Sequence, residues 1–157
     1  MRGAGLDVIA SRIRGAGDVF LFTHEFADGD ALGSMVALML YLQAMGKSVH
    51  AYVPGRIQSV YRFLGTDELL NTMSAAQAAV HVGAAHVTCL SADAADVDRL
   101  GEWKPLFLSG AERLMIDHHD TNGGFGEVFA IDGSASSCCE VLFELFNMID
   151  PRLIDKR

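Results

Sequence analysis

The sequence predicts an α/β fold in which a predominantly parallel β-sheet carries helices on both faces. Short apolar runs of the kind found in buried strands alternate along the chain with segments of helical periodicity. Half of the 157 residues are apolar, which is enough for a packed core. Strands linked through helices form right-handed crossovers, so the strands run parallel and both sides of the sheet are covered. Because no repeat, linker or charge block divides the chain, we expect one domain over residues 1–157.

The first elements follow from local patterns before residue 65. Segment 4–16 places leucine and isoleucine at helical spacing and ends among glycines, so it predicts a helix. Residues 18–23, DVFLFT, predict a short buried strand. Segment 31–45 is rich in Ala, Leu and Met, lacks proline and stops at a glycine, as a helix with a glycine C-cap does. A second strand is predicted over 48–53, and a short helix over 57–64 follows a Pro-Gly break.

The middle of the chain continues the alternation. A weaker helical pattern covers 75–82, and the third strand is predicted over 85–92, AHVTCLSA. A short helix is expected over 96–101, with another over 102–109. They lead into 113–117, RLMID, which is the fourth apolar strand.

Two more elements complete the predicted fold. Residues 126–131 are expected to form a fifth strand. The segment 135–148 carries an apolar stripe at helical spacing and is predicted to be the last helix. Two of its residues, Cys138 and Cys139, are expected to pack within that helix.

Composition narrows the function classes. The 12 Lys and Arg against 20 Asp and Glu leave a net charge of -8, which argues against binding to long duplex nucleic acid. The longest apolar run, 35–42, is far shorter than the roughly 20 residues of a membrane span, so no membrane association is expected. Segment 1–18 does not resemble a secretory signal, and three cysteines make a poor disulfide framework. We therefore expect a cytoplasmic protein with reduced thiols.

Acidic residues and histidines collect directly after three predicted strands. The first strand is followed by 24–30, HEFADGD, the third by Asp93 and the fourth by Asp117, His118 and His119. In an open parallel sheet, ligands bind at the carboxyl edge of the strands. Mixed histidine and carboxylate ligands suit Mn²⁺, Zn²⁺ or Fe²⁺ better than Ca²⁺ or an all-protein Mg²⁺ site.

The number of candidate ligands predicts two ions rather than one. One ion usually takes three or four protein ligands, and at least five are available here, with Asp93 able to bridge. Gly29 is expected to allow a tight turn, so that Asp28 and Asp30 face different ions. Paired metal ions about 3.5–4 Å apart are typical of phosphoester hydrolysis.

Plainer interpretations exist for several of these residues. Asp28 and Asp30 also suit a turn before a helix. Gly33 and Ser34 are expected in the first turn of the following helix, where a substrate phosphate would be favoured, but ordinary helix chemistry explains Ser34 equally well. Arg99 could reach a substrate phosphate or form a surface salt bridge.

Asp93 also has neighbours that compete with it. Asp96 or Asp98 could cap the helix that follows, and such caps explain many aspartates without any catalytic role. Because Asp93 stands directly at the predicted strand end, we favour it as the metal ligand.

Three motifs in order resemble those of the DHH phosphoesterase family. They are THEFADGDALGS over 23–34, Asp93 in DAADVDRLG, and Asp117-His118-His119 followed by Asn122. Together they span nearly the whole chain. Between the motifs, DAADVDRLG, FGEVF and SASSCCEVLFEL are most similar to the branch of bacterial oligoribonucleases and 3'-phosphoadenosine-5'-phosphate phosphatases. RecJ-like single-strand exonucleases and family II pyrophosphatases share the motifs but resemble the intervening sequence less.

The resemblance implies a role for each site residue. It places one Mn²⁺ on His24, Asp28 and Asp93, and a second on Asp30, Asp93 and His118, with Mg²⁺ or Co²⁺ as alternative metals. His119 would face the scissile phosphate or stand behind the ligands, and Asp117 would orient a histidine. The attacking group would be a hydroxide that bridges the metals.

The chain departs from the family pattern at two points. Ala27 stands where members usually have proline, which should loosen the loop without removing a ligand. A later DTG-like motif and a C-terminal substrate domain are also missing before Arg157, so the resemblance implies a partial catalytic domain.

Two function hypotheses follow. The first is a phosphoesterase that hydrolyses 3',5'-bisphosphate nucleotides or short oligoribonucleotides; a RecJ-like exonuclease domain is an alternative within the family. The second is a catalytically incompetent module that binds a metal or nucleotide. The expected partners are a small nucleotide or short oligoribonucleotide, with a homodimer as an open alternative.

Overall fold

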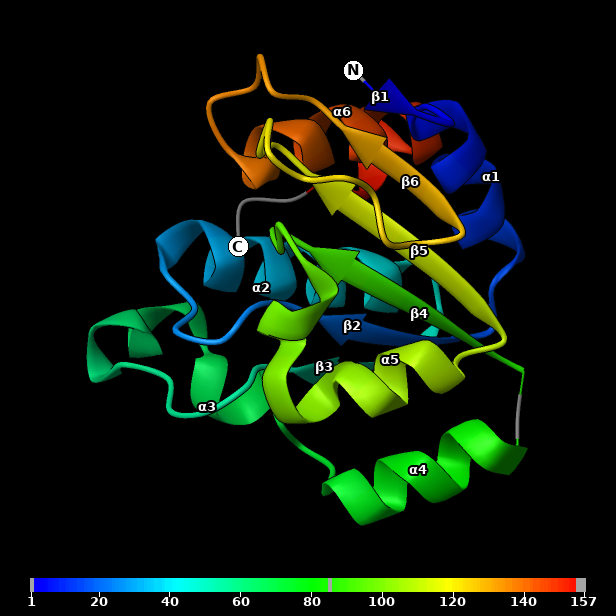
Figure 1. The fold of residues 1–157 in the computed structure, drawn as a ribbon. Helices are drawn as coiled ribbons and strands as arrows, with labels where there is room; N and C mark the ends of the chain where they lie inside the picture. The colour runs from blue at the N-terminus through cyan, green and yellow to red at the C-terminus, as the bar shows by residue number, and fades with distance from the viewer. Residues whose placement is uncertain (1, 85, 155–157) are drawn as a thin grey trace.

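A computed structural model, which describes residues 2–84 and 86–154, confirms the α/β fold (Figure 1). One six-stranded sheet has the order β1-β6-β5-β4-β2-β3. Its strands are β1 (Arg2–Gly3), β2 (Asp18–Phe22), β3 (Ser48–Tyr52), β4 (Val87–Ala92), β5 (Glu112–Asp117) and β6 (Val128–Ile131). Strands β2 to β6 pair in parallel, and β1 pairs antiparallel with β6. Residue 85 of the strand expected over 85–92 lies outside the described residues.

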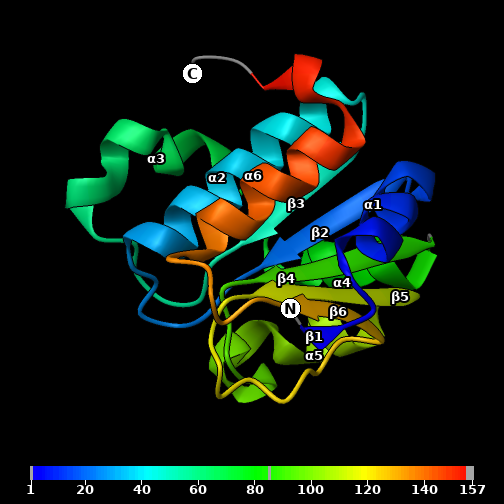
Figure 2. The same ribbon diagram turned by 90° about the horizontal axis from the view of Figure 1, so that it is seen from above.

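Helices cover both faces of the sheet. They are α1 (Leu6–Gly15), α2 (Gly29–Ala44), α3 (Thr66–Leu69), α4 (Ala75–Ala84), α5 (Lys104–Ser109) and α6 (Cys138–Ile149). Three 3-10 helices are η1 (Ser59–Leu64), η2 (Val97–Trp103) and η3 (Pro151–Leu153). Figure 2 shows α2 and α6 side by side on one face together with α1, while α5 lies on the opposite face.

Side chains of the central strands alternate between two cores. Val19 and Leu21 of β2 belong to the larger core, which packs against α1, α2 and α6. Phe20 and Phe22 of the same strand belong to the smaller core, which packs against α4 and α5. This period of two is the pattern of a strand that is buried on both faces.

Several predicted boundaries were wrong for identifiable reasons. Helix α2 begins at Gly29 rather than at residue 31, because Asp28 caps it by accepting from the N–H groups of Asp30 and Ala31. Helix α6 begins at Cys138 rather than at 135, because Ser137 is its N-cap. The helix expected over 96–101 is a 3-10 helix that runs to Trp103. Neither β1 nor α3 was predicted, since each is too short to show a periodic pattern.

The order of the strands determines where the predicted site residues meet. Strand β4 lies between β2 and β5, and Phe22 pairs with Ser91 while Ala92 pairs with Ile116. The segments that follow these strands therefore start at one edge of the sheet. Among the described residues, no helix is long and apolar enough to cross a membrane.

Candidate metal centre

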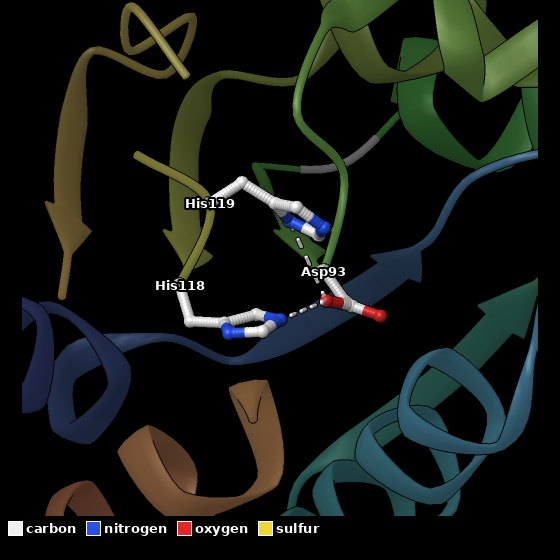
Figure 3. A group of neighbouring side chains, drawn as sticks. All are labelled: Asp93, His118 and His119. Carbon is white, nitrogen blue, oxygen red and sulfur yellow. Dashed lines mark ion pairs between the residues drawn. The ribbon is translucent and has the colours of Figure 1, made fainter. Parts of the chain in front are cut away.

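Four polar side chains converge where β2, β4 and β5 end. His118 Nε2 lies 3.6 Å from Asp93 Oδ1, and His119 Nδ1 lies 3.9 Å from the same oxygen (Figure 3). On the other side of this carboxylate, His24 Nε2 lies 3.8 Å from Asp93 Oδ2. Asp93, which follows β4, is thus shared by imidazoles that follow the two strands on either side of β4.

The surroundings of Asp93 are unfavourable for an ionised carboxylate. Its side chain is 2% exposed, and Oδ1 has no hydrogen-bond partner among the described residues. Its backbone has a φ of 58°, a left-handed conformation that non-glycine residues rarely adopt. Burial raises the pKa of this carboxyl, the negative charges of Asp30 and Asp117 add to the rise, and a hydrogen bond from His24 opposes it. A buried, unpaired carboxylate oxygen of this kind suits a metal ligand.

Two groups of side chains in this part of the chain could each hold an ion. One comprises His24, Asp28 and Asp93, and the other comprises Asp93, His118 and His119. Ligand atoms bound to one ion at about 2.1 Å are themselves roughly 3–3.5 Å apart, so the distances around Asp93 need only small adjustment. The donor set of imidazole and carboxylate fits a divalent transition metal.

Asp28 and Asp30 have different local roles. Asp28 Oδ1 is 3.1 Å from the N–H groups of Asp30 and Ala31, and this N-cap turns the carboxylate toward His24 and Asp93. The Asp30 carboxylate accepts hydrogen bonds from the backbone N–H groups of Cys138, at 2.7 Å, and Cys139, at 3.0 Å, in the first turn of α6. Asp30 Oδ2 also lies 3.5 Å from His118 Nε2, so Asp30 borders the centre without joining either group.

Each histidine has an acceptor beside its Nδ1 atom. His24 Nδ1 lies 2.7 Å from the Glu25 carbonyl oxygen, and His118 Nδ1 lies 3.4 Å from that of Ala135. Donation from Nδ1 leaves Nε2 of His24 and His118 available as a ligand atom. Burial lowers the pKa of His24, but hydrogen bonds with Asp93 and the Glu25 carbonyl outweigh it, so the net shift is upward.

His119 is oriented differently. Its Nδ1 lies 2.8 Å from Asp117 Oδ1, so that nitrogen is already occupied as a donor. The side chain is 38% exposed, whereas Asp117 is fully buried. The pair therefore presents Nε2 of His119 as the nitrogen that Asp117 does not contact.

Asn122 is a site residue whose part in the centre could not be inferred from the sequence. It is buried, and its Nδ2 donates to Asp117 Oδ2 at 2.6 Å and to the Ala94 carbonyl at 2.9 Å. Its Oδ1 accepts from the N–H of Gly124 at 2.8 Å. Asn122 therefore fixes the carboxylate that fixes His119. Only its place after the DHH motif hinted at a role.

The structure changes the interpretation of the expected substrate contacts. Ser34 is fully buried in the second turn of α2, where its hydroxyl lies 3.3 Å from Cys139 Sγ, so it is not exposed to a substrate phosphate. Gly33 also lies in that second turn and faces Cys139. Gly29 is the first residue of α2 and not a tight turn. The Arg99 guanidinium lies 3.2 Å from His24 Nδ1, beside the centre and not in a surface salt bridge.

The neighbouring aspartates separate into a candidate ligand and a cap. Asp96 is the N-cap of η2, since its Oδ1 accepts from the N–H of Asp98 at 2.7 Å. Asp93 caps no helix and stands directly after β4, as expected. Asp98 forms an ion pair with Lys104.

Comparison with known proteins shows which family and relatives the chain is similar to. Residues 18–156 match the sequence profile described as "DHH family, N-terminal domain". The chain is 29% identical over 129 residues to the bifunctional oligoribonuclease and PAP phosphatase NrnA of Bacillus subtilis. It is 30% identical over 134 residues to the protein of the same name from Thermus thermophilus. These alignments cover 82% and 85% of the chain but 37% of each relative.

A solved structure has the same fold. The crystal structure of an exopolyphosphatase-related protein from Bacteroides fragilis superposes with a TM-score of 0.81 at 23% identity, over 92% of this chain and 43% of the other. At this identity the likeness establishes the fold alone. The chain therefore spans less than half the length of these relatives.

Proposed function

This chain belongs to the DHH family, and from that membership we propose that it is the metal-dependent catalytic domain of a phosphoesterase. The observation that carries the proposal is the buried carboxylate of Asp93, whose Oδ1 has no hydrogen-bond partner among the described residues and which stands between His24 on one side and His118 and His119 on the other. The proposed substrates are 3',5'-bisphosphate nucleotides and short oligoribonucleotides.

The proposed ligands divide around the shared carboxylate. His24, Asp28 and Asp93 would hold one divalent ion, and Asp93 with His118 would hold a second, with Asp30 or His119 completing it. We propose Mn²⁺, because imidazole and carboxylate ligands suit it. When bound, such ions polarise phosphoryl oxygens and activate water.

The residues themselves supply orientation and proton control. Asp117 accepts a hydrogen bond from His119 Nδ1, which leaves His119 Nε2 on the side of the ring away from Asp117. There Nε2 can hold or release a proton next to a phosphate oxygen of the substrate. Arg99 places a positive charge beside His24. From there its guanidinium would lie near a phosphate of the bound substrate. The buried floor formed by Asp117 and Asn122 keeps this arrangement fixed.

Two further observations support small nucleotide substrates. Two relatives are named as enzymes that act as oligoribonuclease and PAP phosphatase, although the chain covers only 37% of their length. The chain has a net charge of -8, which disfavours long polyanions and suits a short substrate whose phosphates meet bound metal ions.

The test combines calorimetry with turnover. Metal-free protein is titrated with Mn²⁺, and phosphate release from 3'-phosphoadenosine 5'-phosphate and cleavage of a trinucleotide are then measured. We expect two equivalents of Mn²⁺ in the wild type, with metal binding reduced and turnover lost in Asp93→Asn. The control is Asp96→Asn, which removes a nearby charge but keeps a good N-cap.

Each outcome has a distinct meaning. Two bound ions with turnover support the proposal in full. Bound ions without turnover of either substrate would favour a metal-binding module that is catalytically incompetent on its own. If Asp93→Asn bound Mn²⁺ as the wild type does, the proposed centre would be wrong.

A further inference from the structure

We infer that a cavity next to the metal centre is a subsite for the nucleobase of the substrate, with Phe26 as its stacking surface. The inference rests on the proposed function, because it concerns the part of a nucleotide that lies away from the reacting phosphate. Phe26 stands two residues after His24 and two before Asp28, within the loop that carries both candidate ligands.

Phe26 has an unusual conformation for a phenylalanine. Its φ is 59°, in the left-handed region, and its residue surface is 83% exposed. An aromatic residue gains most by burial, and a bulky residue in this backbone region is strained. Its neighbour Ala27 is buried, so the loop does place an apolar side chain inward at the next position. Strain combined with exposure beside a reactive centre is typical of a residue that meets a ligand.

A cavity of about 250 Å³ lies against Phe26. Its other lining residues include Glu25, Pro54, Arg56 and Glu102. One wall is tied to the centre, because the N–H of Glu25 donates to the Arg99 carbonyl at 2.7 Å and the Arg99 guanidinium lies beside His24. The cavity thus begins at the residue that follows a candidate metal ligand.

Gly101 also lines this cavity and lies next to Pro54. Its φ is 54°, and a Cβ atom there would lie 3.3 Å from Pro54 Cβ. A larger residue would therefore be strained in its backbone and would press on Pro54. The absence of a side chain at Gly101 therefore keeps the cavity open beside Pro54.

The charges of the lining favour a base over a phosphate. Two carboxylates, Glu25 and Glu102, and a single guanidinium, Arg56, line the cavity, so the net negative charge of the lining disfavours an anionic group. The carboxylates can instead accept hydrogen bonds from amino and ring N–H groups, and Arg56 can stack on a base or donate to its carbonyl. The phosphates would lie at the metal centre and the base in this cavity. Bases that carry an amino group should bind better than uracil.

The test compares substrates with and without a base. KM is measured for adenosine 3',5'-bisphosphate and for the abasic 1-deoxyribose 3,5-bisphosphate, with wild type, Phe26→Ala and Phe26→Tyr. Loss of one base-stacking contact corresponds to roughly a tenfold loss of affinity. We expect Phe26→Ala to raise KM for the adenosine compound about tenfold more than for the abasic compound. Phe26→Tyr should retain most of the difference.

A second exposed phenylalanine provides a matched control. Phe63 in η1 is 80% exposed and does not line the cavity, so Phe63→Ala should leave both KM values unchanged. If Phe26→Ala raised both KM values equally, Phe26 would support the loop and not bind the base, and the inference would fail. If Phe26 instead served as a contact for a protein partner, Phe26→Ala would change neither KM value.

A binding measurement separates this inference from the proposed function. 2-Aminopurine riboside 3',5'-bisphosphate is mixed with the protein and Mn²⁺ in a stopped-flow fluorimeter, since stacking on Phe26 should quench its fluorescence. Quenching in the wild type and its loss in Phe26→Ala would support the subsite even if neither substrate were hydrolysed. Turnover without quenching would support the phosphoesterase and overturn the subsite.

Discussion

At the scale of single residues, Asp93 has the most consequences for both metal binding and stability. Asp93 is buried, its Oδ1 accepts no hydrogen bond from the residues that the structure describes, and it lies near the charges of Asp30 and Asp117. Because its pKa is raised in the folded protein, its contribution to stability is greatest below its ordinary pKa and is lost as the pH rises through the folded value. At neutral pH and without metal, we therefore expect the ionised Asp93 to destabilise the fold.

Asp93→Asn should raise the stability of the metal-free protein at pH 7 by about 1 kcal/mol, as the removal of strain at functional sites often does. Urea denaturation with EDTA present measures this. The gain should shrink as the pH is lowered toward 4, where the wild-type carboxyl takes up a proton. If the urea midpoint of Asp93→Asn at pH 7 were equal to or below that of the wild type, the Asp93 carboxylate would have favourable partners in solution and the prediction would be wrong.

Asn122 illustrates what a buried amide does for such a site. Asn122→Ala would leave Asp117 Oδ2 without its donor and the N–H of Gly124 without its acceptor. We expect a loss of roughly 2–4 kcal/mol in the free energy of unfolding, because buried polar groups would be left unpaired. The exposed Asn147, whose amide donates to Phe143 on the surface of α6, gives the control: Asn147→Ala should change stability by no more than about 0.5 kcal/mol.

At the scale of elements, α2 and α6 together shape the centre. Tyr41 of α2 stacks on Phe146 of α6 with ring centroids 4.1 Å apart, and Asp30 accepts from the N-terminal amides of α6. The first turn of one helix therefore holds a carboxylate that belongs to the first turn of the other. This contact joins residues that are 108 positions apart in the sequence.

Two adjacent substitutions should separate the local roles of the motif aspartates. Asp28→Asn keeps an N-cap of equal quality and should alter stability by less than about 0.5 kcal/mol while weakening Mn²⁺ binding. Asp30→Asn turns an amide group toward the α6 N–H donors and should cost about 1–2 kcal/mol. Chemical denaturation and calorimetry on both variants check this. Equal stability losses would show that the α6 amides do not anchor Asp30.

The elements were predictable where the pattern was long and not where a single contact set a boundary. The parallel strands and the helices over 31–45 and 135–148 follow from apolar runs and periodicity. The starts of α2 and α6 depend on caps, and the spacing of Ser137 and Glu140 in the sequence is that of a capping box. The two-residue β1 depends on pairing with β6, which no local pattern reveals.

The site was predictable to the same degree and for related reasons. His24, Asp28, Asp93 and His118 meet because parallel strands end at one edge, which is a property of the topology. The burial of Ser34 against Cys139 and the role of Asn122 depend on tertiary packing. The exposure of Phe26 depends on a left-handed backbone conformation. In a sequence, such a conformation is usually predicted only at glycine.

At the scale of the whole molecule, ion binding and folding should be coupled. Ligands that are close only in the folded state gain stability when the ion binds, by about 2.7 kcal/mol at a metal concentration of 100 times Kd. For a chain of this size that corresponds to a rise in Tm of roughly 5–10 °C. Thermal unfolding with Mn²⁺, and again after EDTA, measures it. Asp93→Asn should show little of the rise, and an equal rise in that variant would point to ions bound elsewhere.

The contact between Asp30 and α6 has a consequence for folding during synthesis on the ribosome. Motif residues near the start of the chain leave the ribosome early, but the amides that hold Asp30 belong to residues 138 and 139. A nascent chain therefore carries most of the candidate ligands long before it can complete their arrangement. We therefore expect the Asp30 carboxylate to take its place beside His118 only after α6 has been synthesised and has docked.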